Sequence, residues 1–201
     1  MRHSAAIAGF YAVLDRDDEA LARQLLGVSR VLQVRIKPGS AADILRIAKL
    51  ARRLCDEVGA LLIVNDRVDL ALASGADGVH LGQTDLPLEE ARRFAPDLII
   101  GVSTHDVRQV VDAVASGADY LGFGPIFATQ TKQNPDPVQG IAGLRSAVAA
   151  ARGTPIVAIG GIDAMPAVAR EVYGAGAAAI CAIRAVNHAS DVQSAARVFA
   201  I

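Results

Sequence analysis

Two aspartates stand where a magnesium ion can be bound. Asp66 follows the apolar run Leu61–Val64, and Asp85 follows the run Gly78–Leu81. If both runs are parallel strands of an alternating strand–helix chain, their carboxyl ends meet at one edge of the sheet. Paired carboxylates suit a hard cation, and Mg²⁺ usually arrives with a phosphate-bearing substrate. The alternative role is structural, because an aspartate after a strand often caps the next helix.

Three polar residues alternate with apolar ones just upstream. Gln33, Arg35 and Lys37 are separated by Val34 and Ile36. On one strand, a period of two places all three side chains on the same face, which is the interior of a closed barrel. Two buried cations need an anionic partner. Arg35 offers a fork for phosphate oxygens, Lys37 a point charge, and Gln33 hydrogen bonds to a neutral heterocycle.

A long polar segment follows a later apolar run. It begins after Gly124-Pro125 and carries Thr129, Thr131 and Lys132. Long loops in compact domains tend to be functional. Two hydroxyls and an ammonium group can grip phosphate oxygens, so we expect this loop to contact substrate.

A second phosphate-binding segment is expected near the C-terminal end. Gly160-Gly161 ends one apolar run, and Ile180-Cys181 ends the next. Glycine lets backbone N–H groups approach an anion. Cys181 is interpreted as a small packed residue, since no base is adjacent to activate it. His80 is interpreted as a pocket-lining or hydrogen-bonded residue, because no second His or Cys stands at zinc-ligand spacing.

The apolar periodicity predicts eight strands and eight helices that alternate. The expected strands are Phe10–Leu14, Val31–Ile36, Leu61–Val64, Gly78–Leu81, Leu98–Val102, Tyr120–Phe123, Ile156–Ile159 and Ala177–Ile180. The expected helices are Asp18–Leu26, Ala41–Val58, Val68–Ser74, Leu88–Phe94, Asp106–Ser116, Ile141–Ala151, Ala164–Tyr173 and Asp191–Phe199. Ser40 is the expected cap of the second helix and Gly59 its expected stop.

This pattern predicts an α/β protein with a single-domain (β/α)8 TIM barrel over residues 1–201. Eight evenly spaced units without a large insertion favour closure over the alternative, an open doubly wound sheet. In such a barrel the chemistry lies at the carboxyl ends of the strands. The polar residues singled out above fall there.

Composition narrows the class of protein. Hydrophobic residues make up 52% of the 201 residues, charged residues 20%, and the net charge is −1. With no basic run and no apolar run of membrane-spanning length, we expect neither a nucleic-acid partner nor a membrane partner. The two separated cysteines predict reduced thiols in a cytoplasmic protein. The oligomeric state stays open, a homo-oligomer included.

Several segments together resemble the thiamine-phosphate synthase family. They are Gln33-Val34-Arg35-Ile36-Lys37, Asn65-Asp66-Arg67, Gly78-Val79-His80-Leu81-Gly82-Gln83 with Asp85, Gly101-Val102-Ser103-Thr104-His105, Gly124-Pro125-Ile126-Phe127 with Thr129, Thr131 and Lys132, and Ile159-Gly160-Gly161-Ile162. They occur in family order from about Phe10 to the C-terminus.

The resemblance implies an activity and a set of residue roles. Members of the family are transferases that couple hydroxymethylpyrimidine diphosphate to a thiazole phosphate and release pyrophosphate in thiamine biosynthesis. The positions matching its pyrimidine-diphosphate site are Gln33, Arg35, Lys37, Asn65, Ser103 and Lys132, of which Arg35, Lys37, Ser103 and Lys132 are the expected catalytic residues. Asp66 and Asp85 match its Mg²⁺ ligands, and Thr129, Thr131, Gly161, Ile180 and Cys181 match its thiazole-phosphate site.

Two positions depart from the family pattern. Ile36 stands where the family usually has Glu, and Cys181 where it usually has Ser. We expect the Ile36 side chain to point away from the barrel interior. Two other functions stay open: a thiazole tautomerase-like paralogue that needs no Mg²⁺, and a non-catalytic phosphate-ligand-binding barrel.

Overall fold

The strands close into a parallel barrel. The computed structural model describes residues 7–128 and 137–200. Its strands are β1 Gly9–Leu14, β2 Val31–Val34, β3 Leu61–Asn65, β4 Gly78–Leu81, β5 Ile99–Thr104, β6 Tyr120–Phe123, β7 Ile156–Ile159 and β8 Ala179–Cys181. They pair in chain order, and β1 also pairs with β8. The predicted (β/α)8 barrel is therefore confirmed, and the open sheet is excluded.

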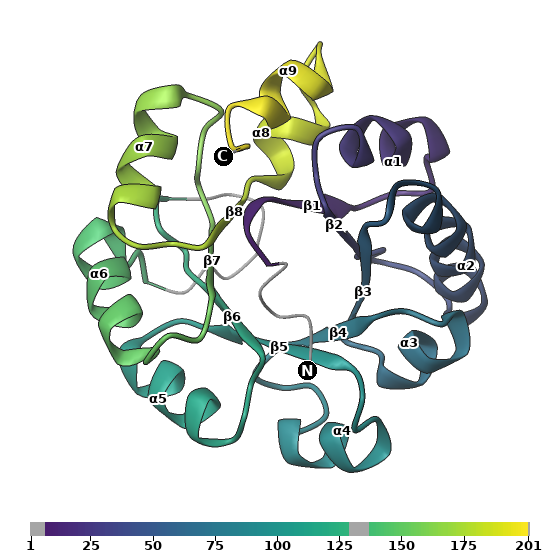
Figure 1. Cartoon of the computed structure of the whole chain (residues 1–201), viewed down its shortest axis with the longest axis horizontal. Helices are drawn as coiled ribbons and strands as arrows, with labels where there is room; N and C mark the ends of the chain where they lie inside the picture. The colour runs from purple at the N-terminus through teal and green to yellow at the C-terminus, as the bar shows by residue number, and fades with distance from the viewer. Residues whose placement is uncertain (1–6, 129–136, 201) are drawn as a thin grey trace.

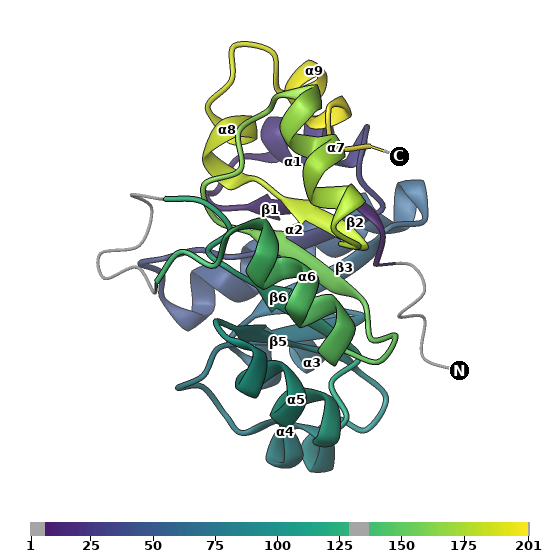
Figure 2. The same ribbon diagram turned by 90° about the vertical axis from the view of Figure 1, so that its left-hand side faces the viewer.

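The helices surround the strands (Figure 1). In Figure 2, α5, α6 and α7 lie over the outer surface of the strands. The helices are α1 Glu19–Leu26, α2 Ala41–Val58, α3 Val68–Ser74, α4 Leu88–Phe94, α5 Val107–Ala115, α6 Gly140–Ala150, α7 Pro166–Gly174, α8 Ile183–Asn187 and α9 Val192–Arg197. Each predicted helix has a counterpart. The short α8 was not predicted.

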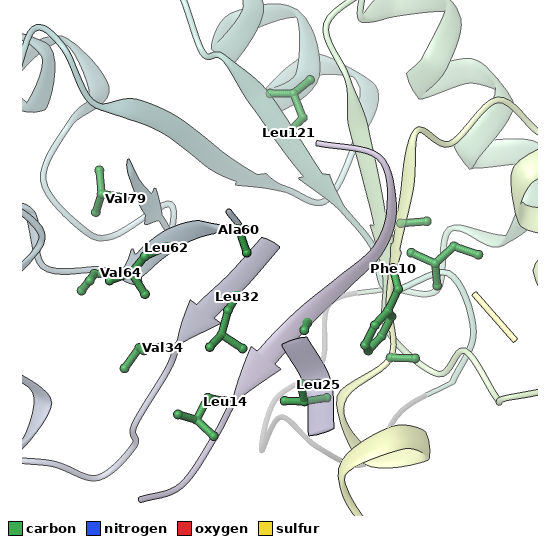
Figure 3. Packing of buried hydrophobic residues seen from close by; sticks show 14 of the residues in the cluster. Phe10, Leu14, Leu25, Leu32, Val34, Ala60, Leu62, Val64, Val79 and Leu121 are labelled. Atoms are coloured by element: carbon green, nitrogen blue, oxygen red, sulfur yellow. The ribbon is translucent and has the colours of Figure 1, made fainter. Parts of the chain in front are cut away.

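Alternate residues of each strand belong to two separate cores. On β1, Phe10 and Leu14 join the large cluster between strands and helices, part of which Figure 3 shows. Tyr11 and Val13 join a smaller cluster that fills the barrel interior. This alternation follows from the two-residue period of a strand whose two faces are both buried. It also tells which side chains can reach the open end of the barrel.

The helix ends follow from local sequence. The Ser40 side chain accepts a hydrogen bond from Asp43 N, and Gly59 ends α2 in the left-handed conformation with φ 66°. Both predicted signals of α2 are confirmed. Gly75 ends α3 in the same way, with φ 69°. A residue without Cβ takes this conformation at little cost.

Two repeated junctions secure the amino-terminal ends of the strands. Asp77 accepts hydrogen bonds from Leu62 N (2.7 Å) and Arg52 Nη1 (2.6 Å). Asp119 ends the same Ser-Gly-Ala-Asp sequence as Asp77 and accepts from Ile100 N (2.8 Å) and Arg92 Nη2 (2.5 Å). These aspartates join a strand to a helix at the end opposite the predicted site.

Candidate active site

The two predicted metal ligands lie together. Asp66 follows β3, and Asp85 lies in the loop between β4 and α4; both line a cavity of about 310 Å³. Burial raises the pKa of Asp85, the Gly82 N–H lowers it, and the adjacent Asp66 carboxyl raises it. Asp85 Oδ2 accepts that Gly82 hydrogen bond at 2.6 Å. Two carboxyl groups this close form a site that attracts a cation.

Neither aspartate caps a helix. The N-cap positions of α3 and α4 are Arg67 and Pro87, and neither helix has a side-chain capping hydrogen bond. Asp66 instead adopts a left-handed backbone with φ 63°, which is uncommon outside glycine and tolerated best by Asp and Asn. Such a conformation at a strand end is typical of a functional position. The structural alternative considered for the two aspartates is thus wrong.

The cationic residues approach this acidic pair from β2. Lys37 Nζ lies 2.6 Å from Asp66 Oδ2, with about half of the lysine side chain exposed. Gln33 is 5% exposed and takes the interior face of β2. Arg35 lies just beyond the strand, and its charge acts on the pKa values of the interior residues His80 and Cys181. The guanidinium group therefore lies near the open end of the barrel interior.

One feature of the cationic segment was predicted wrongly. The prediction gave a strand over Val31–Ile36 and placed the side chains of Gln33, Arg35 and Lys37, the residue that follows it, on one interior face. In the structure β2 ends at Val34, so Arg35 and Lys37 lie beyond the strand, and Lys37 pairs with the Asp66 carboxylate. The reason is that the ladder between β2 and β3 ends at the Val34–Val64 pair.

The cavity beside the acidic pair has two kinds of wall. Lys37, Asn65, Asp66 and Asp85 form its polar side. Val34, Ile36 and Ile44 form its apolar side. Ile36 packs against the core between strands and helices, so its side chain points away from the barrel interior, as predicted. An isoleucine in place of the family's usual glutamate thus changes the apolar wall of the cavity and leaves the barrel interior unchanged.

His80 and Ser103 lie at the centre of the barrel. His80 Nε2 is 2.9 Å from Ser103 Oγ, and His80 Nδ1 is 3.0 Å from the hydroxyl of Tyr120. Burial lowers the pKa of His80 to about 4; the Asp66 carboxylate raises it and the Arg35 charge lowers it. His80 is therefore neutral at pH 7. Of its two predicted roles the hydrogen-bonded one is confirmed, and His80 does not line the cavity beside the acidic pair.

Two residues of this centre were missed by sequence reasoning. The hydroxyl groups of Tyr11 and Tyr120 lie 2.7 Å apart, and both side chains are buried. The available signal was a tyrosine on the interior face of an apolar strand, because a buried hydroxyl needs a partner. Which partner it finds depends on the stagger between β1 and β6, and the sequence pattern does not specify that stagger.

Three other predicted phosphate residues lie across the barrel: Gly161 just after β7, and Ile180 and Cys181 on β8. Gly161 has φ 67°, and a Cβ there would lie 2.5 Å from the Phe127 and Ala128 carbonyl oxygens. Cys181 is 2% exposed in the interior, while the Ile180 side chain is buried in the outer core. Ile180 can therefore reach a ligand only through its backbone. Burial raises the pKa of Cys181 to about 12, so it is a protonated thiol and not a nucleophile.

The long loop is anchored at both of its described ends. Phe127 N donates to Gly160 O at 2.9 Å, and Gln139 N donates to Pro125 O at 2.9 Å. Thr129, Thr131 and Lys132, which we expect to contact phosphate, lie outside the described residues. The anchoring places the ends of the loop beside the Gly160-Gly161 turn.

The donor set fits magnesium. Within residues 7–128 and 137–200, no group of three or more His, Cys, Asp or Glu side chains is arranged to hold a metal. A transition-metal cage is therefore not formed by this part of the chain. Two adjacent carboxylates without a third ligand match the way Mg²⁺ binds, with one or two protein carboxylates, several waters and substrate phosphates.

The fold and this site together define a class of protein. A closed parallel barrel with acidic and cationic side chains at the carboxyl ends of its strands is a (β/α)8 enzyme scaffold. A family model described as thiamine monophosphate synthase matches residues 9–186. The chain belongs to the thiamine monophosphate synthase family.

Individual relatives agree over nearly the whole chain. A thiamine-phosphate synthase from Anaeromyxobacter dehalogenans is 46% identical over 198 residues, covering 96% of this chain and 86% of the relative. One from Methanocella arvoryzae is 47% identical over 180 residues, covering 89% and 84%. The solved structure of a thiamine phosphate pyrophosphorylase from Pyrococcus furiosus superposes with a TM-score of 0.87 at 39% identity, covering 96% and 94%. The predicted resemblance and the predicted enzyme class, a transferase, are confirmed.

More distant structures share the fold alone. A 3-hexulose-6-phosphate synthase superposes with a TM-score of 0.71 at 20% identity. Among the described residues, no helix is both long and apolar enough to cross a bilayer.

Proposed function

We propose that this chain is a magnesium-dependent thiamine-phosphate synthase that couples hydroxymethylpyrimidine diphosphate to a thiazole phosphate. The observation that carries the proposal is the charge cluster at the ends of β2, β3 and β4. There Lys37 contacts Asp66, and Asp66 lies beside Asp85. Family membership supplies the reaction. The cluster supplies groups of both signs for a diphosphate and its counterion.

The diphosphate is proposed to bind between this cluster and the loop after β6. Arg35, Lys37 and Lys132 neutralise its oxygens, and Ser103 donates a hydrogen bond to it. Asp66 and Asp85 would hold Mg²⁺, which would supply Lewis-acid stabilisation of the diphosphate. Gln33 and Asn65 hold the pyrimidine, and Thr129, Thr131, Gly161, Cys181 and the Ile180 backbone hold the thiazole phosphate.

The proposed reaction needs no side-chain nucleophile. The bond between the pyrimidine methylene carbon and the diphosphate oxygen breaks, and its electron pair leaves with pyrophosphate. The electron-rich aminopyrimidine stabilises the cation until the thiazole nitrogen attacks and forms the new C–N bond. The contribution of the chain is positioning and electrostatic stabilisation. A protonated Cys181 and a neutral His80 agree with this division of roles.

Both cysteines are free and buried, which fits a reducing compartment, and we propose the cytoplasm.

The test is pyrophosphate release from the two substrates with and without Mg²⁺, in wild type and in Asp66→Asn. Asparagine tolerates the left-handed backbone of Asp66, so the fold is retained while one metal carboxylate is lost. We expect turnover to fall roughly 10²-fold or more. Asp69→Asn is the matched control, because Asp69 is an exposed neighbour paired with Arg67.

Three other results would contradict the proposal. Thiazole isomerisation without pyrophosphate release would identify the tautomerase-like alternative. Tight binding of both substrates without turnover would identify a non-catalytic barrel. Wild-type turnover in Asp66→Asn would show that Asp66 has no part in metal binding.

A further inference from the structure

A chain of hydrogen bonds crosses the barrel interior and ends at the open face. It runs from the Tyr11 hydroxyl to that of Tyr120 (2.7 Å), on to His80 Nδ1 (3.0 Å), and from His80 Nε2 to Ser103 Oγ (2.9 Å). The four residues come from β1, β6, β4 and β5. We call this set the interior relay. Its deep end, Tyr11, is 3% exposed, whereas Ser103 is only partly buried.

The deep end fixes the direction of the hydrogen bonds. Among the residues that the structure describes, Tyr120 is the one hydrogen-bond partner of the Tyr11 hydroxyl. The surrounding interior cluster is otherwise made of apolar residues and Cys181. The hydrogen of Tyr11 must therefore point at the Tyr120 oxygen, because a buried donor without an acceptor is costly. Tyr120 then donates its own hydrogen to His80 Nδ1.

Only one protonation state of His80 satisfies the whole relay. With hydrogen on Nδ1, His80 donates to Tyr120, and one of the two tyrosine hydroxyls is left without an acceptor. With hydrogen on both nitrogens, the same hydroxyl is left over. With hydrogen on Nε2 alone, each tyrosine hydrogen has an acceptor, and His80 donates to Ser103 Oγ.

We propose that Tyr120 and His80 are positioning residues: Tyr120 holds His80 as its Nε2–H tautomer, and His80 in turn makes Ser103 direct its own hydrogen toward a ligand oxygen. Ser103 accepts from His80 and has one hydrogen left, which faces the open end of the barrel. The site therefore selects a ligand with an acceptor at this point. The identity of that acceptor as an oxygen of the pyrimidine diphosphate rests on the proposed function.

The packing around the relay keeps its two rings in place. A Cβ at Gly101 would lie 2.0 Å from Tyr120 Cζ, and one at Gly122 would lie 3.1 Å from His80 Cε1. Both rings thus rest against a backbone without a side chain. Gln83 Nε2 also donates to the Ser103 carbonyl oxygen at 2.6 Å, which holds the β5 backbone beside the relay. The geometry is therefore set before any ligand arrives.

The direct test is the tautomer of His80 in the substrate-free protein. Two-bond ¹H–¹⁵N correlation spectra of ¹⁵N-histidine-labelled protein distinguish Nδ1–H, Nε2–H and the imidazolium, and the His80 signals are assigned by their loss in His80→Gln. We expect Nε2–H in wild type. We expect the same tautomer in Tyr11→Phe, since the Tyr120 hydrogen still has its only acceptor at Nδ1. In Tyr120→Phe the preference should be lost. A wild-type Nδ1–H tautomer or imidazolium overturns the proposal.

Kinetics separate positioning from a merely structural role. With the pyrimidine diphosphate as the varied substrate, we expect Tyr120→Phe to lower kcat/KM about tenfold, the scale of one hydrogen bond to a charged group. KM for the thiazole phosphate should not change. In a Ser103→Ala background Tyr120→Phe should have no further effect. An equal loss in both backgrounds overturns the proposal.

The two proposals fail in different ways. If wild type forms no product while His80 is the Nε2–H tautomer, the proposed function is wrong and the relay stands. If wild type forms product and His80 carries its hydrogen on Nδ1, the relay is wrong and the proposed function stands.

Discussion

Substituting Gly101 by alanine should damage both the barrel and the site. The added Cβ would lie 2.0, 2.3 and 2.5 Å from Tyr120 Cζ, Cε1 and Cε2. All three contacts are far shorter than the 3.5–4.0 Å at which carbon atoms pack. The Tyr120 ring cannot move aside easily, because its hydroxyl contacts Tyr11 and His80. Either β5 shifts or the ring leaves its place.

The expected cost lies at the upper end of the range for overpacked cores. We expect about 3 kcal/mol of lost unfolding free energy. For a protein of this size, each 1 kcal/mol lowers Tm by roughly 2–4 °C, so Tm should fall by roughly 6–12 °C. Calorimetry or thermal circular dichroism measures this shift. Since Tyr120 contacts His80, the variant should also lose pyrophosphate release under conditions where it is still folded.

Two comparisons isolate the cause. At Gly174, the last residue of α7, an added Cβ meets nothing within 4 Å. Gly174→Ala should therefore stabilise the protein by about 0.5 kcal/mol through helix propensity. Tyr120→Val removes the clashing ring atoms, so Gly101→Ala should cost much less in that background. If Gly101→Ala has the same cost with and without the ring, or leaves Tm unchanged, the packing explanation is wrong.

Two further predictions concern titratable groups. The pKa of His80 falls from its ordinary value of 6.5 to about 4 on folding, so the unfolded chain binds more protons between these pH values. The neutral histidine thus gives stability that is present above pH 6.5 and is lost as pH falls toward 4. The difference is about 3 kcal/mol relative to His80→Gln, measured by urea unfolding; parallel pH profiles of the two proteins would contradict it. Burial raises the pKa values of Cys55 and Cys181 to about 12, so both should react with iodoacetamide at pH 8 only after unfolding. Rapid labelling of the native protein, followed by mass spectrometry, would show that one thiol is accessible.

Much of the fold could be predicted because each strand–helix unit carries local sequence signals that mark where its helix ends. Gly59 and Gly75 end α2 and α3 in the left-handed conformation, and the next strand follows at once. Such local signals mark eight strand–helix units, and closure follows from their number and even spacing. The bounds of β2 were wrong at the C-terminal end, because a strand ends where its ladder ends, and the ladder depends on the neighbour. The five-residue α8 is too short to show a helical period.

The candidate site, too, could be predicted from the sequence only in part. Asp66 and Asp85 could be predicted to lie together, since each follows a strand and the two strands are consecutive. The pair between Tyr11 and Tyr120 joins residues that are 109 positions apart. Its formation depends on how β1 and β6 are staggered across the barrel. That stagger is a property of the closed structure, so a hydroxyl in an apolar strand indicates a partner without naming it.

The partners of the aspartates explain why the two ends of this barrel differ in role. At the amino-terminal end, Asp77 and Asp119 each bind a strand N–H and an arginine, so their charge is matched by donors of the chain. At the carboxyl end, Asp66 and Asp85 lie beside each other. Their donors within the chain are the half-exposed Lys37 on Asp66 and the Gly82 N–H on Asp85. Two adjacent carboxylates repel each other, so their proximity itself does not stabilise the fold. Such an arrangement is stabilised when a cation binds, which supports the proposed role of the acidic pair in function.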